Sequence, residues 1–334
     1  MKKIPTYIIS GFLGSGKTTL LQNILKYCKS QQIKAAILLN ELGSVNVEKH
    51  LFEDENVYEL LDGCICCSIQ EDLKTTLTSL LAVHPEKPLD ALFIEGTGVA
   101  NPLEIVEVLA SLPYVHSFDV QSVISMIDAS SYLENQGIFT IKTVRDLLKN
   151  QIKGATTVIL NKVDLVNEKQ LQKIESKLTM VLDTYTQVLK SSYGKVDIVE
   201  LLQKRSNTTV VSHKHQTGCC DDHAHSTCQH DHKHHHDHVQ HASIKTLTIQ
   251  DVPSVTKRQL KKWLKSLPEG IMRGKGYIFL KEKQGLYPFQ YSSNQMYIGD
   301  FPQKYATDPC IVLIGKDIDI ATIQDSYTSQ FSLS

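Results

Sequence analysis

A glycine-rich octapeptide near the start of the chain limits the possible fold more than any other feature. It stands between the apolar run Ile4–Ser10 and the amphipathic stretch Thr18–Cys28, so it predicts a loop that joins a strand to a helix. Its glycines let backbone N–H groups turn toward phosphate oxygens, and the following helix presents its positive end. The alternative is a merely glycine-rich turn, which the complete match disfavours. The octapeptide is Gly11-Phe12-Leu13-Gly14-Ser15-Gly16-Lys17-Thr18, followed by Thr19.

Two side chains of this loop have predicted chemical roles. Lys17 would reach the β- and γ-phosphates of a nucleotide, and the Thr18 hydroxyl would ligate Mg²⁺. We therefore expect Lys17 and Thr18 to be catalytic. The nucleotide-binding residues predicted from the loop are Gly11, Gly14, Ser15, Gly16, Lys17, Thr18 and Thr19.

Short apolar runs alternate with helical patterns through the first two hundred residues. The expected strands are Ile4–Ser10, Ala35–Asn40, Val57–Leu61, Leu89–Glu95, Ser122–Asp128 and Thr157–Asn161. The expected helices include Thr18–Cys28, Glu71–Leu81, Leu103–Leu109, Ile141–Ile152 and Lys169–Leu182. This order predicts an α/β fold of the phosphate-loop nucleoside triphosphatase type, a doubly wound, mostly parallel sheet with helices on both faces.

A composition break at Ser206–Ala242 predicts three regions in this chain of 334 residues. Residues 1–205 would form the nucleotide-binding domain, 206–242 a mobile linker, and 243–334 a smaller α+β domain. The strands expected in the last region are Ile244–Ile249, Gly276–Leu280, Tyr287–Tyr291, Gln295–Ile298 and Ile311–Ile314. Its expected helices are Val255–Leu267 and Asp319–Ser326.

The segment Asn161-Lys162-Val163-Asp164 predicts a preference for guanine. A carboxylate here can accept both the ring N–H and the exocyclic amino group of guanine, a pair that adenine does not offer. The alternative is an Asp that caps the following helix. We expect Asn161, Lys162 and Asp164 to bind the nucleotide, and the loop Ser192–Gly194 to close over the base.

A carboxylate at the end of another expected strand predicts a metal contact within the same site. In Ile94-Glu95-Gly96-Thr97-Gly98, Glu95 would hold Mg²⁺ through water, and the Gly98 N–H would face the γ-phosphate. We therefore expect Glu95 to be catalytic and Gly98 to bind nucleotide. The alternative is an ordinary carboxylate at a strand end.

Cys64, Cys66 and Cys67 form a tight group that is typical of thiolate metal ligands. Three soft sulfur ligands suit zinc or Cu(I), with a fourth position left for another ligand. The alternatives are buried structural cysteines or a redox thiol pair.

A second group of potential ligands lies between His213 and His241, where 11 His, 3 Cys and 4 Asp occupy 18 of 29 positions. Such a segment cannot build a core, and its imidazoles and thiolates favour capture of divalent metal over a merely solvated linker. The candidate ligands are His213, His215, Cys219, Cys220, His223, His225, Cys228, His230, His232, His234, His235, His236, His238 and His241.

Charge and hydropathy exclude several other classes of function. The formal net charge is -1, so no strong field attracts nucleic acid or acidic lipid. No apolar run approaches the roughly 18 residues needed to span a membrane, and the first residues lack a cleavage site for a signal peptide. Clustered cysteines without an export signal indicate a cytoplasmic protein.

The motifs share one location, because each follows an expected strand and ligand sites of open parallel sheets lie beyond the carboxyl ends of the strands. The thiolate loop should therefore lie on the same edge as the nucleotide. Glu41, which follows the second expected strand, is a candidate ligand for either Mg²⁺ or the thiolate-bound metal. Nucleotide state and metal affinity would then be linked, and the linkage would be reciprocal.

Taken together, the motifs resemble those of the CobW-like family of P-loop GTPases, which are relatives of the hydrogenase and urease nickel-insertion GTPases. Besides the motifs above, the resemblance includes Asn40-Glu41-x-Gly43 and, near the C-terminus, Arg273-Gly274-Lys275-Gly276. It implies GTP hydrolysis coupled to delivery of zinc, or sometimes cobalt, with Cys64, Cys66 and Cys67 in the metal-binding motif. Members commonly have Asn-Glu-Phe-Gly-Glu, where this chain has Leu42 and Ser44 in place of the aromatic residue and the second acid.

The sequence therefore predicts a GTP-hydrolysing metallochaperone that uses GTP, Mg²⁺ and Zn²⁺, with Co²⁺ or another divalent metal as a further candidate. Its expected partner is a client protein that requires metal, and it would act as a monomer or homodimer. Two alternatives remain open at this stage. One is a zinc buffer or sensor without transfer, and the other is a phosphotransferase built on a phosphate loop.

Overall fold

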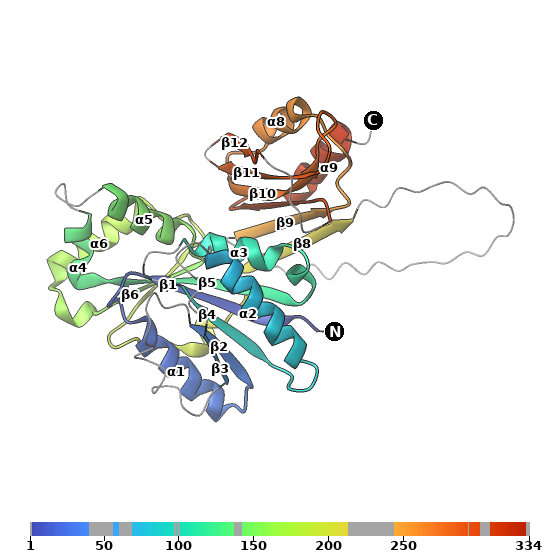
Figure 1. Cartoon of the computed structure of the whole chain (residues 1–334). Coiled ribbons are helices and arrows are strands. Elements are labelled where there is room, and N and C mark those ends of the chain that lie inside the picture. The colour runs from blue at the N-terminus through green and yellow to red at the C-terminus, as the bar shows by residue number, and fades with distance from the viewer. Residues whose placement is uncertain are drawn as a thin grey trace, which may run out of the picture.

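The computed structural model describes residues 2–39, 56–59, 69–96, 98, 101–136, 142–212, 244–292, 294–300 and 308–331. These residues form two sheets with helices packed on them (Figure 1). Within this part of the chain, every helix is too short or too polar to cross a lipid bilayer.

The first sheet has seven strands in the order β3-β2-β4-β1-β5-β6-β7, and all of its strand pairs are parallel. The strands are β1 Ile4–Gly11, β2 Ala35–Leu39, β3 Asn56–Glu59, β4 Ala91–Glu95, β5 Phe118–Asp128, β6 Thr157–Asn161 and β7 Gln187–Lys190. Their nearly continuous apolar sequences fit strands that are buried on both faces. The predicted doubly wound α/β fold is confirmed.

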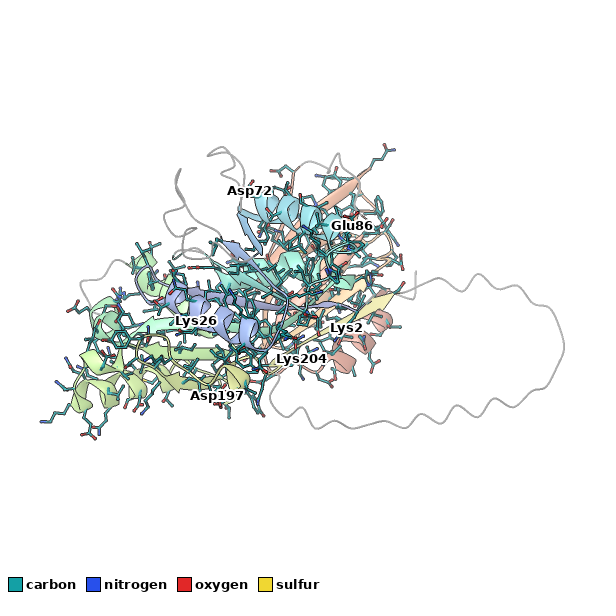
Figure 2. The ribbon with its side chains drawn as sticks, turned by 90° about the horizontal axis from the view of Figure 1, so that it is seen from below. Lys2, Lys26, Asp72, Glu86, Asp197 and Lys204 are labelled. Atoms are coloured by element: carbon teal, nitrogen blue, oxygen red, sulfur yellow. The ribbon has the colours of Figure 1, made fainter. Side chains whose placement is uncertain are left out.

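Helices cover both faces of this sheet. They are α1 Lys17–Ser30, α2 Ile69–Val83, α3 Pro102–Ala110, α4 Ala129–Asn135, α5 Lys142–Lys153, α6 Glu168–Thr179 and α7 Ile198–Leu201, with the short 3₁₀ turns η2 Tyr114–His116 and η3 Val163–Leu165. Because alternate residues of a strand face opposite sides, Ile9 packs with α1 whereas Ile8 packs with α2 and α3. Figure 2 shows the result, with Lys26 on α1 and Asp72 on α2 lying on opposite sides of the sheet.

The second sheet has six strands in the order β12-β11-β10-β13-β9-β8. Its strands are β8 Ser206–Ser212, β9 Ile244–Gln250, β10 Ile271–Phe279, β11 Leu286–Ser292, β12 Gln295–Ile298 and β13 Cys310–Gly315, and its helices are α8 Lys257–Ser266 and α9 Ile320–Phe331. All pairs are antiparallel except β8 with β9. This is the smaller α+β domain that the sequence predicts.

The two sheets are joined by a shared apolar core. One face of the second sheet is covered by α8 and α9, where Trp263 packs edge-on against Tyr327 and Phe331. The opposite face carries Val312 and Ile314, which pack in the same cluster as α3 of the first domain. In Figure 1, α3 accordingly lies beside the second sheet.

The predicted start of the linker is wrong by seven residues. Ser206–Ser212 forms β8, a strand that pairs along its full length with β9. The β-branched run Thr208–Val211 favours a strand. Apolar and polar residues do not alternate along Ser206–Ser212, however, so the sequence resembles the polar segment that follows it. The remainder of the predicted linker, residues 213–242, lies outside the described residues.

Candidate nucleotide site

Four strands end side by side at the edge where the sequence places the site. Their order in the sheet is β4-β1-β5-β6, and all run in the same direction. They therefore bring Glu95, Gly11, Asp128 and Asn161 to one edge. Three of these residues are predicted from sequence, and Asp128 is an addition.

The glycine-rich loop has a left-handed backbone, which favours glycine, at the three positions Gly11, Gly14 and Gly16. Gly11 and Gly16 have φ angles of 138° and 103°. A Cβ atom at Gly11 would lie 2.3 Å from the Met126 carbonyl oxygen, and one at Gly16 would lie 2.4 Å from Asn161 Nδ2. The loop is thus packed tightly against β5 and β6, which fixes the direction of its N–H groups.

The first turn of α1 offers an electrostatic site for an anion. Gly16 is the N-cap and provides no side-chain acceptor, and the first turn contains no acid. Its N–H groups and the helix dipole therefore favour negative charge at this end. Thr18 is half-buried and Thr19 exposed in this turn, whereas Ser15 is buried in the loop before it.

Lys17 lies inside the loop and not in solvent. Its side chain is only 7% exposed, and Nζ donates to the carbonyl oxygens of Gly11 at 3.0 Å and Phe12 at 3.3 Å. The same Nζ lies 3.7 Å from Glu95 Oε1, whose side chain is 13% exposed. A cation and a carboxylate therefore stand together at the end of β4 and the start of α1, the combination that phosphate with a hard metal ion requires.

The loop after β4 touches the glycine-rich loop directly. A Cβ atom at Gly98 would lie 2.8 Å from the Leu13 backbone nitrogen, so a larger residue could not approach as closely. The Gly98 carbonyl oxygen accepts a hydrogen bond from Gln151 Nε2 of α5 at 3.1 Å. Gly98 is thereby held beside the residues that would surround phosphate.

Asn161 joins three segments of the site. Its Nδ2 donates to the Ser15 carbonyl oxygen at 2.9 Å, and its Oδ1 accepts from the Gly194 N–H at 3.1 Å. Asn23 of α1 holds the same late loop, because its Nδ2 donates to the carbonyl oxygens of Tyr193 and Gly194. The loop Ser192–Gly194 is therefore fixed beside the predicted guanine segment.

Lys162 has an unusual backbone and a specific partner. Its φ angle of 60° lies in the left-handed region, which is costly for a residue with a Cβ. Its Nζ donates to Asp128 Oδ2 at 2.6 Å. Although partial burial opposes ionisation of Asp128, hydrogen bonds from Lys162 and Ser130 lower the pKa of this carboxyl below its usual value. The pair thus fixes the Lys162 side chain along this edge of the sheet.

Asp164 is exposed in the turn η3, next to Lys162 and Asn161. It follows β6, and β5 separates β6 from β1, the strand that leads into the glycine-rich loop. The exposed Tyr193 lies in the adjacent loop. The predicted guanine segment and the predicted loop over the base thus follow the neighbouring strands β6 and β7.

The predicted ligands of a thiolate-bound or histidine-bound metal lie outside the described residues. This applies to Glu41, the three clustered cysteines and the whole tract from His213 to His241. Among the residues that the structure does describe, no group of three or more His, Cys, Asp and Glu side chains could hold a metal ion.

Sequence reasoning missed Asp128, Asn23 and Gln151. Asp128 could have been found, because it ends a strand whose neighbour carries the guanine segment. Asn23 and Gln151 could not, since each is an ordinary polar residue within a helix and acts through a loop distant in the chain.

The fold and this edge together define a nucleotide-binding domain of the phosphate-loop class. Residues 5–189 match the family model described as CobW/HypB/UreG, nucleotide-binding domain, and residues 244–329 match the model described as Cobalamin synthesis protein cobW C-terminal domain. The chain belongs to the CobW/HypB/UreG family.

Two curated relatives of similar sequence are named as a zinc-regulated GTPase activator and as a zinc chaperone. The chain is 31% identical over 235 residues to zinc-regulated GTPase metalloprotein activator 1 of Dictyostelium discoideum, which covers 60% of this chain and 48% of the relative. It is also 31% identical over 203 residues to the zinc chaperone YjiA of Escherichia coli K12, which covers 59% of this chain and 60% of the relative. The chain thus spans about half to three fifths of the relatives it matches.

Among solved structures, Zn(II)-bound YjiA GTPase from E. coli aligns over 99% of both chains with a TM-score of 0.48 and 22% identity. HypB from Helicobacter pylori in complex with nickel aligns over 59% of this chain and 82% of its own, with a TM-score of 0.40 and 16% identity.

Proposed function

We propose that the chain is a GTP-hydrolysing metallochaperone that binds zinc and delivers it to a client protein in a nucleotide-dependent way. The observation that carries the nucleotide part is the shared edge, where Lys17 and Glu95 stand beside the glycine-rich loop and Asp164 lies exposed beyond Asn161. A single guanine nucleotide would span both groups.

In this proposal, Asp164 selects guanine. Its carboxylate would accept the two N–H groups on one edge of the base, while Asn161 and Lys162 hold the surrounding backbone. Adenine would leave the carboxylate unpaired, so we expect a strong preference for GTP over ATP.

The phosphates and Mg²⁺ would occupy the opposite end of the site. The hydroxyl of Thr18 and the carboxylate of Glu95 are hard oxygen ligands, which suit Mg²⁺. Lys17 would exchange its contacts with the Gly11 and Phe12 carbonyl oxygens for phosphate oxygens. Bound Mg²⁺ supplies neutralisation of the charge that develops on the phosphates.

Zinc is the proposed cargo, with Co²⁺ or another divalent metal as an alternative. The thiolates of Cys64, Cys66 and Cys67 would hold it, since soft sulfur ligands suit zinc. The names of the zinc chaperone and zinc-regulated relatives support this choice. The His-rich tract would act as a tethered reservoir that raises the local metal concentration.

We also propose that the chain acts in the cytoplasm, where clustered thiols remain reduced. The chain would consist of a GTPase domain, a metal-binding linker that begins after β8, and a C-terminal domain. The family matches at 5–189 and 244–329 support two folded units on either side of that linker.

A metal-transfer assay with GTP, GDP or no nucleotide tests the proposal. Zinc-loaded protein is mixed with a fluorescent zinc acceptor, and the rate of transfer is followed for the wild type and for Cys66→Ala. We expect transfer to depend on nucleotide in the wild type, and the variant to lose this dependence. Transfer at the same rate in all three nucleotide states would instead fit a zinc buffer.

The phosphotransferase alternative is tested by phosphate release. A metallochaperone GTPase should release inorganic phosphate from GTP without any small-molecule acceptor. Hydrolysis that requires an added acceptor would favour the phosphotransferase.

A further inference from the structure

The motif Arg273-Gly274-Lys275-Gly276 lies in the middle of β10. Arg273 and Lys275 are paired in register with Ile314 and Val312 of β13, so all four side chains share one face of the sheet. That face is the one that packs on α3 of the first domain. The two basic side chains of the motif are therefore directed at the nucleotide-binding domain.

Arg273 holds two carboxylates of α3. Its Nε lies 2.6 Å from Glu107 Oε1, and its Nη1 lies 3.4 Å from Glu104 Oε1. Glu107 is only 5% exposed, and burial raises the pKa of its carboxyl while the Arg273 guanidinium opposes that rise. Loss of the guanidinium would leave the buried Glu107 charge without its close partner, which is strongly unfavourable. The contact between Arg273 and Glu107 is therefore expected to persist.

Lys275 holds the start of α2. Its Nζ donates to Gln70 Oε1 at 2.5 Å, and Gln70 is the second residue of that helix. Lys275 is half-buried, and burial lowers the pKa of its ammonium while the neighbouring Glu107 opposes the change. Two residues of one strand thus contact two helices of the other domain.

Each of these two helices begins shortly after a motif that the sequence analysis assigns to the metal site or the nucleotide site. α2 starts at Ile69, immediately after the thiolate motif in sequence. α3 starts at Pro102, and the side chain of its N-cap residue Asn101 accepts a hydrogen bond from the Leu103 N–H. Asn101 lies only three residues after Gly98, and Gly98 contacts the glycine-rich loop. Each helix therefore connects one of these predicted functional segments to the residues that contact β10.

A second set of contacts between the domains lies at the opposite edge of the first sheet. Lys316, which follows β13, is only 6% exposed and pairs with Asp183 at 2.7 Å. Its Nζ also donates to the Ala155 carbonyl oxygen at 2.9 Å. Both partners precede β6 or β7, so this contact attaches the domains at the amino ends of the strands, away from the nucleotide edge.

The cavity beside Lys275 does not offer a binding site for an organic ligand. It is lined by Gln70, Glu107 and Cys310 among others, and its volume is about 40 Å³. Pockets for small organic molecules are roughly 300 Å³ or larger, whereas a cavity of this size accommodates water. The basic residues of β10 therefore act on the helices themselves.

We propose that Arg273 and Lys275 are positioning residues of the nucleotide site, which couple the C-terminal domain to α2 and α3 and so make that domain respond to the bound nucleotide. This inference rests on the proposed guanine-nucleotide site. Because coupling is reciprocal, the same contact sets how readily α2 and α3 adopt the arrangement that GTP hydrolysis needs.

Hydrogen exchange on the full-length chain tests the coupling. The amides of β10 are followed with a non-hydrolysable GTP analogue and with GDP, and the turnover of GTP is measured alongside. In the wild type, we expect the β10 amides to exchange at rates that differ about fivefold between the two nucleotides. Arg273→Met and Lys275→Met should reduce this difference below about twofold. Both variants should also change kcat of GTP hydrolysis more than KM. Arg273→Lys, which keeps the charge, should retain part of the difference.

Lys316→Met is the control, because it removes another cation that forms an ion pair between the same two domains, at the amino ends of the strands. In this variant, the exchange rates of the β10 amides should differ between the two nucleotides as much as in the wild type. If Arg273→Met folds poorly, Arg273→Met with Glu107→Gln removes both charges of the pair, and we expect the double variant to fold but remain uncoupled.

Each remaining result has a definite meaning. The coupling role would be overturned if Arg273→Met and Lys275→Met keep the wild-type difference in exchange rate. It would also be overturned if Lys316→Met reduces that difference as much as they do. A wild type that binds GTP but shows no difference in β10 would overturn it as well, while leaving the GTPase proposal intact. A wild type that fails to bind the GTP analogue would overturn both.

Discussion

The nucleotide edge and the domain interface differ in how their residues are brought together. At the edge, Lys17 and Asp164 each belong to a short motif at the end of a strand, and parallel strands place those ends side by side. At the interface, Arg273 meets Glu104 and Glu107 across more than 160 residues of chain. The first arrangement follows from local sequence and topology, whereas the second exists only once the two sheets have packed.

The largest effect expected at the edge comes from Lys17→Ala. The substitution removes a buried cation from the place where negative charge develops, and a loss of about 100-fold or more in GTP turnover is expected. Lys26→Ala, in an exposed position of the same helix (Figure 2), should leave turnover unchanged. Phosphate release measures both. Equal rates for the two variants would remove Lys17 from the site.

Asp164→Asn tests the base-binding half of the edge. An amide N–H would face the N–H groups of guanine, so GTP affinity should fall about 10- to 100-fold while ATP affinity stays low and unchanged. Asp197→Asn is the control, because Asp197 caps α7 through an oxygen that asparagine also provides. Titration calorimetry with non-hydrolysable analogues of GTP and ATP measures the preference. A variant that still prefers the GTP analogue as strongly as the wild type would contradict the assignment.

Arg273→Met tests whether the interface is stabilised by its buried charge pair. Removing the guanidinium leaves Glu107 buried without its closest cation, and a loss of about 2 kcal/mol in unfolding free energy is expected at neutral pH. Urea unfolding measures it. Lys316→Met provides the comparison for a buried cation elsewhere in the same interface.

The loss caused by Arg273→Met should shrink at acidic pH. The folded-state pKa of Glu107 is raised, so its neutral form favours folding at low pH and that advantage disappears as pH rises through the folded pKa. Besides Arg273, Lys275 faces the Glu107 carboxyl with positive charge and Glu104 with negative charge. Losing the Arg273 guanidinium therefore raises the pKa of Glu107 further. A loss of stability that is independent of pH would show that the charge of Glu107 is not involved.

The smallest expected effect concerns the C-terminal domain alone. Thr256 caps α8 in a capping box with Gln259, so Thr256→Ala should destabilise that domain by about 1 kcal/mol. Trp263, the only tryptophan, is buried in the same domain, so its fluorescence reports this unfolding. GTP turnover should not change. A fall in turnover without unfolding would mean that the edge depends on the second domain beyond the contacts of β10.

Sequence alone predicts the edge well because its chemistry is local. At Gly11 and Gly16, a positive φ angle and neighbouring atoms a few ångströms away require a residue without a Cβ atom. The glycines of the sequence motif therefore predict this backbone directly. The structure adds Asp128, whose partner Lys162 is 34 residues away. It also corrects Ser206–Ser212, where an edge strand of mixed polarity gives no periodic signal.

The interface could not be predicted in the same way. Arg273 and Lys275 are recognisable as a motif, but nothing near them in sequence indicates α2 or α3 as their partner. The alternation of β10 places both on one face, yet which domain covers that face depends on the packing of Val312 and Ile314. Glu107 illustrates the limit, since a helical glutamate is usually exposed and this one is buried.

The central claim is that a guanine nucleotide and a thiolate-bound metal are linked within one molecule. It is tested most directly by titrating one equivalent of zinc per chain into wild-type protein that carries a non-hydrolysable GTP analogue, GDP or no nucleotide. A zinc affinity that differs several-fold between the GTP-like and GDP-bound states is predicted, in the range typical of coupled sites. The same affinity in all three states would contradict the claim.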